Sequence, residues 1–158
     1  MTNADHSNAS MSELDIERLI PHRLPMRLVE EVVKVDEVSI ETRGEVRTTW
    51  PTARDGHAST VLLAEFVAQS AAALQGWKER HEKSAAIGGL LVGIPASKAT
   101  AATIPLGTRL CCTVNISHGA TNYLAFEGQV HDEVGRLWSK SSIQAYRPDD
   151  LVLPGVSP

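Results

Sequence analysis

Apolar residues recur along the chain with two different periods, which predict strands arranged around one long helix. Residues 58–77 contain a single charged side chain, Glu65, within an alanine-rich stretch, and this composition predicts a helix that is apolar on nearly all sides. Residues 38–48 alternate apolar or small side chains with charged ones, which predicts a strand with one charged face. Burying such a helix in a small protein requires a sheet that curls around it, with help from a second subunit.

Further strands are expected on both sides of this helix. Before it, residues 26–35 predict an irregular strand, and Ser12 is expected to cap a short helix over 13–19. After it, a charged exit turn at 78–83 leads into four strands in succession, at about 85–98, 108–117, 123–132 and 137–147. Two strands, a buried helix and four more strands make an α+β pattern.

Length and composition agree with one globular domain. The chain has 158 residues, of which 42% are apolar and 22% are charged. It is therefore long enough to bury a core, and it is not polar enough to be disordered throughout. We expect a single domain over residues 12–150, a disordered leader at 1–11 and a loose tail at 151–158.

Charge and cysteine usage exclude several classes of function. The formal net charge is -4 and no two lysine or arginine residues are adjacent, so no nucleic-acid partner is expected. Cys111 and Cys112 point to opposite faces of a strand and cannot form a disulfide framework. The long helix is too polar to span a membrane and no signal peptide is visible, so we expect a cytoplasmic protein. Neither a metal nor a cofactor is expected, because ligand spacings and nucleotide motifs are lacking.

Three segments resemble the (3R)-hydroxyacyl-ACP dehydratases of fatty-acid synthesis. Residues 19–29, LIPHRLPMRLV, are similar to the family's LLPHRYPFLLVDR opening, and residues 62–69, LLAEFVAQ, to the LIEAMAQ of its central helix. A looser match follows at residues 88–93, GGLLVG, and 104–107, IPLG. Over residues 13–150 the chain resembles a divergent branch of that family that occurs in aryl polyene and related polyketide-like clusters. The resemblance implies the hotdog fold, in which an antiparallel sheet wraps around a long central helix.

The resemblance also implies an activity and a set of site residues. The activity is that of a hydro-lyase acting on a 3-hydroxyacyl thioester, carried by ACP or CoA, in fatty-acid or polyketide-like biosynthesis. Glu65 matches the family's helix acid, and burial is expected to raise its pKa, which suits a general acid. Gly93 matches a glycine whose backbone N–H faces the thioester. Val61 at the helix start, Leu91, and Gln69, which is one turn after Glu65, are the other candidate substrate-binding residues.

The chain departs from the family at the catalytic histidine. The family carries this histidine in an HFPGxP loop about fourteen residues before the helix glutamate, where the present sequence has Pro51. The histidine nearest to that place is His57, which we interpret as a substitute base facing Glu65 of another subunit, or else as a solvated loop residue. His22 is expected to anchor the first turn in a structural role.

Several alternatives stay open at this point. Glu65 can instead face solvent or pair with an arginine such as Arg54 or Arg109. A lone helix carboxylate on this fold can also activate water, as in a hotdog thioesterase. Because the HFPG histidine is absent, the chain can also be a catalytically silent subunit that pairs with an active dehydratase. In each case we expect an oligomer, either of identical chains or as a heterodimer with a homologous dehydratase.

Overall fold

The computed structural model describes residues 15–82 and 89–147. The expected leader, the tail and the expected cap Ser12 lie outside the described residues. In chain order the elements are α1 (Ile16–Leu19), β1 (Glu31–Val35), β2 (Ser39–Glu45), β3 (His57–Ser59), α2 (Leu62–His81), β4 (Leu90–Ala99), β5 (Thr103–Pro105), β6 (Arg109–Ala120), β7 (Tyr123–Asp132) and β8 (Leu137–Tyr146).

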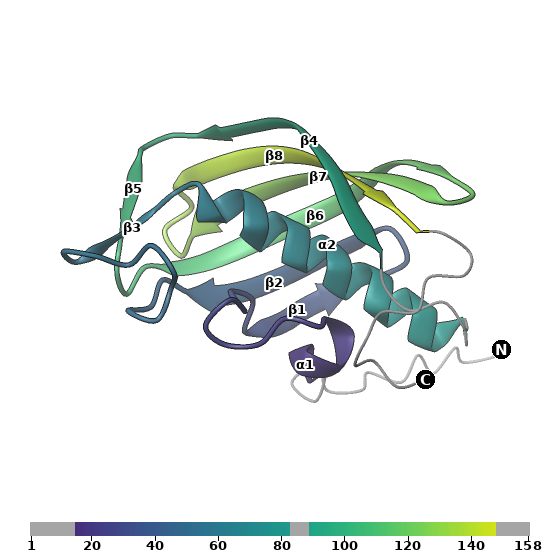
Figure 1. Ribbon diagram of the computed structural model, residues 1–158, viewed down its shortest axis with the longest axis horizontal. Coiled ribbons are helices and arrows are strands. Elements are labelled where there is room, and N and C mark those ends of the chain that lie inside the picture. The colour runs from purple at the N-terminus through teal and green to yellow at the C-terminus, as the bar shows by residue number, and fades with distance from the viewer. Residues whose placement is uncertain (1–14, 83–88, 148–158) are drawn as a thin grey trace, which may run out of the picture.

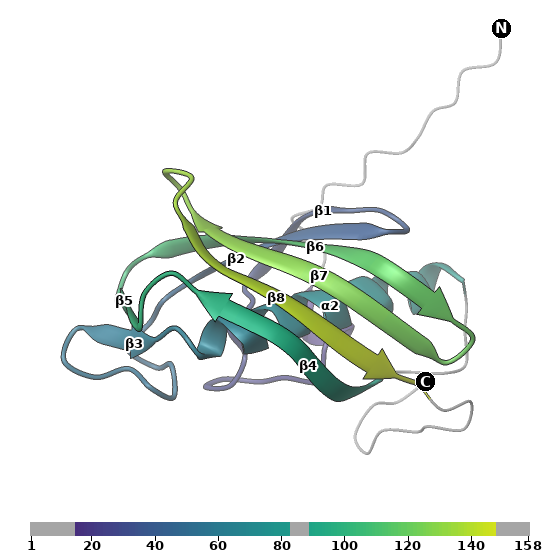
Figure 2. The same ribbon diagram turned by 90° about the horizontal axis from the view of Figure 1, so that it is seen from above.

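One antiparallel sheet wraps around the long helix. Among the described residues it has six strands in the order β1–β2–β6–β7–β8–β4, so β1 and β4 form its two edges. The helix α2 lies along the inner face of this sheet, which curves around it from β1 to β4 (Figure 1). The short strands β3 and β5 form a separate ribbon near the start of α2 (Figure 2). The sequence did not predict this ribbon, because each of its strands is only three residues long.

The sheet-facing side of α2 forms the core. Phe66, Val67 and Leu74 are completely buried against the sheet. Val67 packs directly on the backbone of β7 at Gly128, where a Cβ atom would lie 2.3 Å from Val67 Cγ1. The absence of a side chain at residue 128 therefore allows the helix to approach the sheet this closely.

The side of α2 that faces away from the sheet is more exposed to solvent than the sequence pattern predicts. Val61, immediately before the helix, is 71% exposed, and Glu65, Ala68 and Ala72 are partly exposed. These positions follow one another at helical spacing, so they form one stripe along α2. The sheet buries one side of the helix and leaves this stripe available to another surface.

The ends of α2 differ from the expected ones. The helix continues to His81 because the expected exit turn is helical, and its last turn carries basic side chains that suit the negative end of the helix dipole. At the start, Ser59 Oγ accepts the Val61 N–H at 3.3 Å. The hydroxyl of Thr60 does not cap the helix and donates instead to carbonyl groups of the turn between β4 and β5.

Residues 26–30 are not part of a strand, contrary to the prediction for 26–35. The strand β1 begins only at Glu31 and contains a bulge between Val32 and Lys34. Upstream of it, the backbone N–H of Leu28 and the carbonyl of Met26 bind the side chain of Gln69, and they do not pair with a strand neighbour. A long-range side-chain contact thus replaces the expected ladder.

One other strand boundary also differs from the sequence pattern. The strand β6 continues to Ala120, through the expected break at 118–122, with a register shift between Ile116 and His118.

On the same strand, Cys112 is buried and Cys111 is half-buried beside Glu41, so the two cysteines lie on opposite faces as expected.

Candidate active site

Glu65 lies in the first turn of α2, where its side chain remains 29% exposed. Its Oε1 atom lies 3.3 Å from Nε2 of His22 and accepts a hydrogen bond from Nε2 of Gln69 at 2.9 Å. Among the described residues, no contact engages the second carboxylate oxygen, Oε2. One oxygen is therefore fixed by the protein, and the other is available to a ligand.

The surroundings of Glu65 keep its carboxylate ionised. Burial by itself raises the pKa of Glu65, but the hydrogen bonds from His22 and Gln69 and the positive charge of His22 outweigh burial and lower it. The expectation of a raised pKa is therefore wrong for this chain. It failed because the sequence pattern shows the apolar helix around Glu65 but not the two donors that reach it.

Gln69 connects Glu65 to the segment before β1. Its side chain is completely buried. The amide nitrogen donates to Glu65 and to the carbonyl of Met26 at 2.8 Å, and the amide oxygen accepts the N–H of Leu28 at 2.8 Å. Gln69, a candidate substrate-binding residue, is thus buried away from any substrate, and its amide fixes the position of residues 26–28 over the helix.

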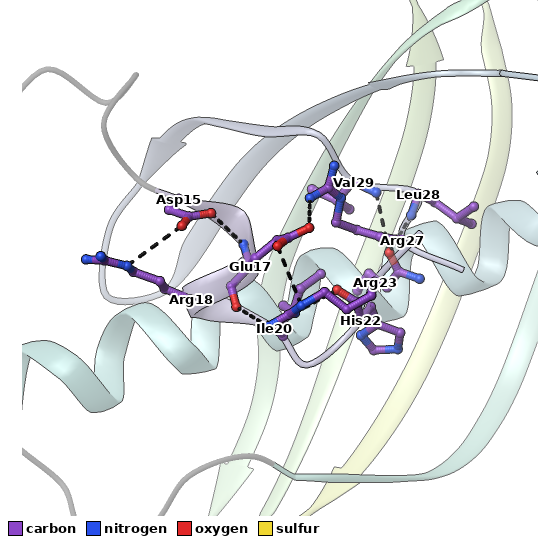
Figure 3. A network of polar contacts seen from close by, with 10 residues as sticks. Asp15, Glu17, Arg18, Ile20, His22, Arg23, Arg27, Leu28 and Val29 are labelled. Atoms are coloured by element: carbon purple, nitrogen blue, oxygen red, sulfur yellow. Dashed lines mark hydrogen bonds and ion pairs between the residues drawn. The ribbon is translucent and has the colours of Figure 1, made fainter. Parts of the chain in front are cut away.

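His22 reaches Glu65 from a segment that is held by two arginines. The guanidinium of Arg23 donates to the backbone carbonyls of Glu17, Ile20 and His22 at 2.9–3.0 Å, and Arg27 forms an ion pair with Glu17 (Figure 3). The short helix α1 that precedes this segment is capped by Asp15, whose carboxylate accepts the Glu17 N–H. These contacts fix the backbone on which His22 sits.

The contact between His22 and Glu65 is the part of the site that sequence reasoning missed. His22 was assigned a structural role, although the same Pro-His-Arg segment carries the resemblance at the start of the chain. The sequence contains a weak signal for this contact, because a lone acidic residue in an apolar helix requires a polar partner. It does not identify that partner, since His22 lies 43 positions before Glu65.

The arginines suggested as partners of Glu65 are engaged elsewhere. Arg54 pairs with Asp55, and Arg109 pairs with Glu133. The alternative that an arginine neutralises Glu65 is therefore wrong for the described chain.

His57 does not meet Glu65 within the chain. It lies on β3 directly after a tight turn in which Asp55 and Gly56 have φ angles of 50° and 77°. The ring is exposed, and its Nδ1 atom lies 3.1 Å from the carbonyl oxygen of Asp55. The structure thus places His57 on a surface hairpin near the start of α2.

The other candidate residues lie on α2 and on the edge strand β4. Val61 precedes the helix and shares the exposed stripe with Glu65. Leu91 is 46% exposed on β4. Gly93 lies two residues further on, between two register shifts in the pairing of β4 with β8, and a Cβ atom there would lie 3.1 Å from Oε1 of Gln144. The edge strand is therefore irregular at the expected thioester-binding glycine.

Within residues 15–82 and 89–147, the strand β4 presents an apolar edge that no other strand covers. It is the last strand of the sheet, with β8 as its neighbour on one side. Its exposed large side chains are Leu90, Leu91, Val92 and Ile94. Exposed apolar strand edges promote pairing with another chain, so this edge is a candidate interface.

Within residues 15–82 and 89–147, no three histidine, cysteine, aspartate or glutamate side chains are grouped closely enough to hold a metal ion. No described helix is both long enough and apolar enough to cross a membrane.

Solved structures share this architecture. The dehydratase heterocomplex ApeI:P from Xenorhabdus doucetiae matches with a TM-score of 0.77 at 24% sequence identity, over 87% of this chain and 93% of that chain. A hypothetical thioesterase with coenzyme A from Streptococcus pneumoniae TIGR4 matches with a TM-score of 0.59 at 13% identity, over 75% and 84% of the two chains. The PaaI protein of E. coli matches with a TM-score of 0.57 at 10% identity, over 73% and 81%. No curated protein sequence matches the chain.

The wrapped helix and the similar structures define the protein as a hotdog-fold protein, as the sequence resemblance implied. Residues 14–153 match the family described as ApeP-like, ApeP dehydratase. The chain belongs to this family, and the expected dehydratase-like function is thereby confirmed at the level of the family.

Proposed function

We propose that the chain is a subunit of a hydro-lyase that removes water from a 3-hydroxyacyl thioester, with Glu65 acting on the C3 hydroxyl. The observation that carries the proposal is the carboxylate of Glu65, which is anchored through Oε1 and keeps Oε2 unpaired. In this elimination the C2–H bond breaks and its electron pair forms the C2=C3 double bond. The C3–O bond breaks with it, and the hydroxyl group leaves as water after gaining a proton.

Glu65 can supply that proton once the site is covered. In the single chain the carboxylate is partly exposed and its pKa is lowered. A second subunit and an acyl chain remove water from around the carboxylate, and burial favours the protonated form. Substrate binding therefore shifts Glu65 toward the state that a general acid requires.

The proposal assigns the thioester carbonyl to backbone donors. Negative charge develops on this oxygen when the C2 proton leaves, and N–H groups stabilise such charge. The start of α2 after Val61 lies at the positive end of the helix dipole, and among its described N–H groups that of Leu62 has no hydrogen-bond acceptor. The backbone N–H of Gly93, on the irregular edge strand, is the second proposed donor.

The acyl chain is assigned to the apolar surface between α2 and β4. Leu91 and its exposed neighbours on β4, together with Ala68 and Ala72 on the helix, provide this surface. Binding an acyl chain removes apolar area from water on both partners, at about 25 cal/mol for each Å². ACP and CoA both present the acyl group as a thioester, and the proposal covers both carriers.

A second hotdog subunit is proposed to cover the edge of β4. The apolar side chains on this strand and the unpaired edge of the sheet support the proposal. The similar structure from Xenorhabdus doucetiae is a heterocomplex. We propose either a second copy of this chain or a homologous dehydratase subunit in this place.

The base that removes the C2 proton is proposed to come from that second subunit. In an oligomer of identical chains His57 of the neighbouring copy fills this role, because its ring is exposed on the hairpin near the start of α2. The second candidate function is that of a partner subunit that contributes Glu65 and lacks a base of its own. Pro51, at the position of the family's histidine, favours this second candidate.

The experiment that tests the proposal mixes the protein with a 3-hydroxyacyl thioester on ACP and on CoA, and follows the products by mass spectrometry. Loss of one water by the wild-type protein, abolished in Glu65→Gln, is the expected result. Activity of the chain alone that is abolished in His57→Ala supports an oligomer of identical chains in which His57 supplies the base. Activity that appears only with a homologous dehydratase, and that requires Glu65, supports the subunit lacking a base. Release of free thiol without loss of water indicates a thioesterase and contradicts the proposal.

A further inference from the structure

Only one of the two ring nitrogens of His22 has a polar partner among the described residues. Nε2 lies 3.3 Å from Oε1 of Glu65, whereas Nδ1 is buried without a hydrogen-bond partner. A buried N–H group without an acceptor costs more than a bare lone pair in the same place, because it loses its bond to water and gains none. Nε2 therefore carries a proton in the neutral ring as it does in the charged ring, and it donates this proton to Glu65.

Other cations of the same segment do not compete for this carboxylate. Arg23 and Arg27 both engage Glu17, and Arg23 also binds three backbone carbonyls. These contacts hold the segment in place independently of Glu65. On α2 the other group bound to the carboxylate is the neutral amide of Gln69. Within the described chain, the donors to Glu65 are thus the ring of His22 and the amide of Gln69.

We propose that His22 is the positioning residue of Glu65: its Nε2–H fixes Oε1 and leaves Oε2 to meet the C3 hydroxyl of the substrate. This inference rests on the proposed function. It adds His22 of the same chain to Glu65 as a residue of the proposed active site. It assigns to His22 a functional role in place of the structural role expected from the sequence. His22 acts through Glu65 and does not itself need to touch the substrate.

Three variants separate this role from a structural one. His22→Phe removes the donor, and His22→Gln keeps an N–H group at about the place of Nε2. Arg18→Gln removes only an exposed ion pair with Asp15 in the preceding helix α1 and leaves the contacts of His22 intact, and so serves as the control. In the assembled enzyme we expect His22→Phe to lower kcat roughly ten- to a hundred-fold, as for the loss of one hydrogen bond to a charged group, with KM changed less than about two-fold. His22→Gln should restore most of kcat, and Arg18→Gln should retain it.

A second readout does not depend on turnover. The carboxyl carbon of Glu65, observed by NMR in labelled protein, reports its pKa directly. Loss of the donor in His22→Phe should raise this pKa, and His22→Gln should return it toward the wild-type value. An unchanged pKa in His22→Phe overturns the proposal, as does a fall in kcat that is equal in Arg18→Gln and not rescued in His22→Gln. If the wild-type protein never removes water, the proposed function fails, and the titration still decides whether His22 controls Glu65.

Discussion

The amide of Gln69 donates to the carboxylate of Glu65 one helical turn earlier, at 2.9 Å, and also holds the backbone of the segment that carries His22. A single buried side chain thus connects the core helix, the acidic group and the loop above it. This arrangement makes Gln69 important for stability, and in the proposed function it makes Glu65 the residue through which the segment acts on the substrate.

The first prediction concerns this amide. Gln69→Leu removes the acceptor for the backbone N–H groups of Leu28 and Val29, and so leaves two buried donors unpaired. We expect a loss of about 2–4 kcal/mol in the free energy of unfolding, measured by urea titration. Gln75→Leu is the matched control, because the amide nitrogen of Gln75 is buried without a partner and its loss should cost little. Equal losses in the two variants would contradict the role given to Gln69.

The second prediction concerns the close approach of α2 to β7. Gly128→Ala places a methyl group 2.3 Å from Val67 Cγ1, and the overpacking should cost about 1–3 kcal/mol of stability. Val67→Ala creates the space that this methyl group needs. The double variant should therefore lose less free energy of unfolding than the sum of the losses in the two single variants. Gly119→Ala, which meets only the end of the Leu124 side chain, is the control and should be nearly neutral. Additive losses at residues 67 and 128 would show that the helix does not rest on the strand at this point.

The third prediction follows from the lowered pKa of Glu65. A carboxyl group whose pKa is lower in the folded than in the unfolded chain stabilises the fold above its ordinary value of 4.5, and this contribution is lost as the pH falls through the folded value. Glu65→Gln removes the titration. The stability difference between wild type and Glu65→Gln should therefore be constant near neutral pH and should shift against the wild type below about pH 4.5. A difference that does not change over this range would show that His22 and Gln69 do not hold the ionised form.

The fourth prediction concerns the edge of the sheet. Val92→Glu places a charge on β4, where we propose that a second subunit binds, and should shift the assembly toward the monomer in size-exclusion chromatography with light scattering. Val134→Glu provides the control, since Val134 is 90% exposed on the turn between β7 and β8. An assembly that survives Val92→Glu but dissociates in Val134→Glu would place the interface elsewhere.

The fold was largely predictable from the sequence because its main signals are local. The apolar helix around Phe66 and the alternating strand over residues 39–45 are both present close to the expected positions. The errors lie where a distant contact decides the local structure. Residues 26–30 have the sequence pattern of a strand, but the backbone of Met26, Leu28 and Val29 binds the side chain of Gln69.

The sequence was sufficient to identify Glu65 as the candidate site residue, but it did not predict which groups surround this side chain. A lone acid in an apolar helix, together with the family resemblance, was sufficient to select Glu65. Its lowered pKa depends on His22, which arrives from a segment 43 positions away and whose approach depends on the arrangement around Arg23. The exposed edge of β4 likewise depends on strand order, which the sequence pattern alone does not specify.

The most direct test of the account follows hydrogen exchange at C2 of the substrate. The reverse reaction adds D2O across the double bond of an enoyl thioester and places a deuteron on C2, so mass spectrometry reads the proton transfer itself. With the assembled enzyme the account predicts deuterium incorporation by wild type, and a loss of at least a hundred-fold in a folded Glu65→Gln variant. Incorporation by Glu65→Gln at the wild-type rate would show that this carboxylate takes no part in the reaction.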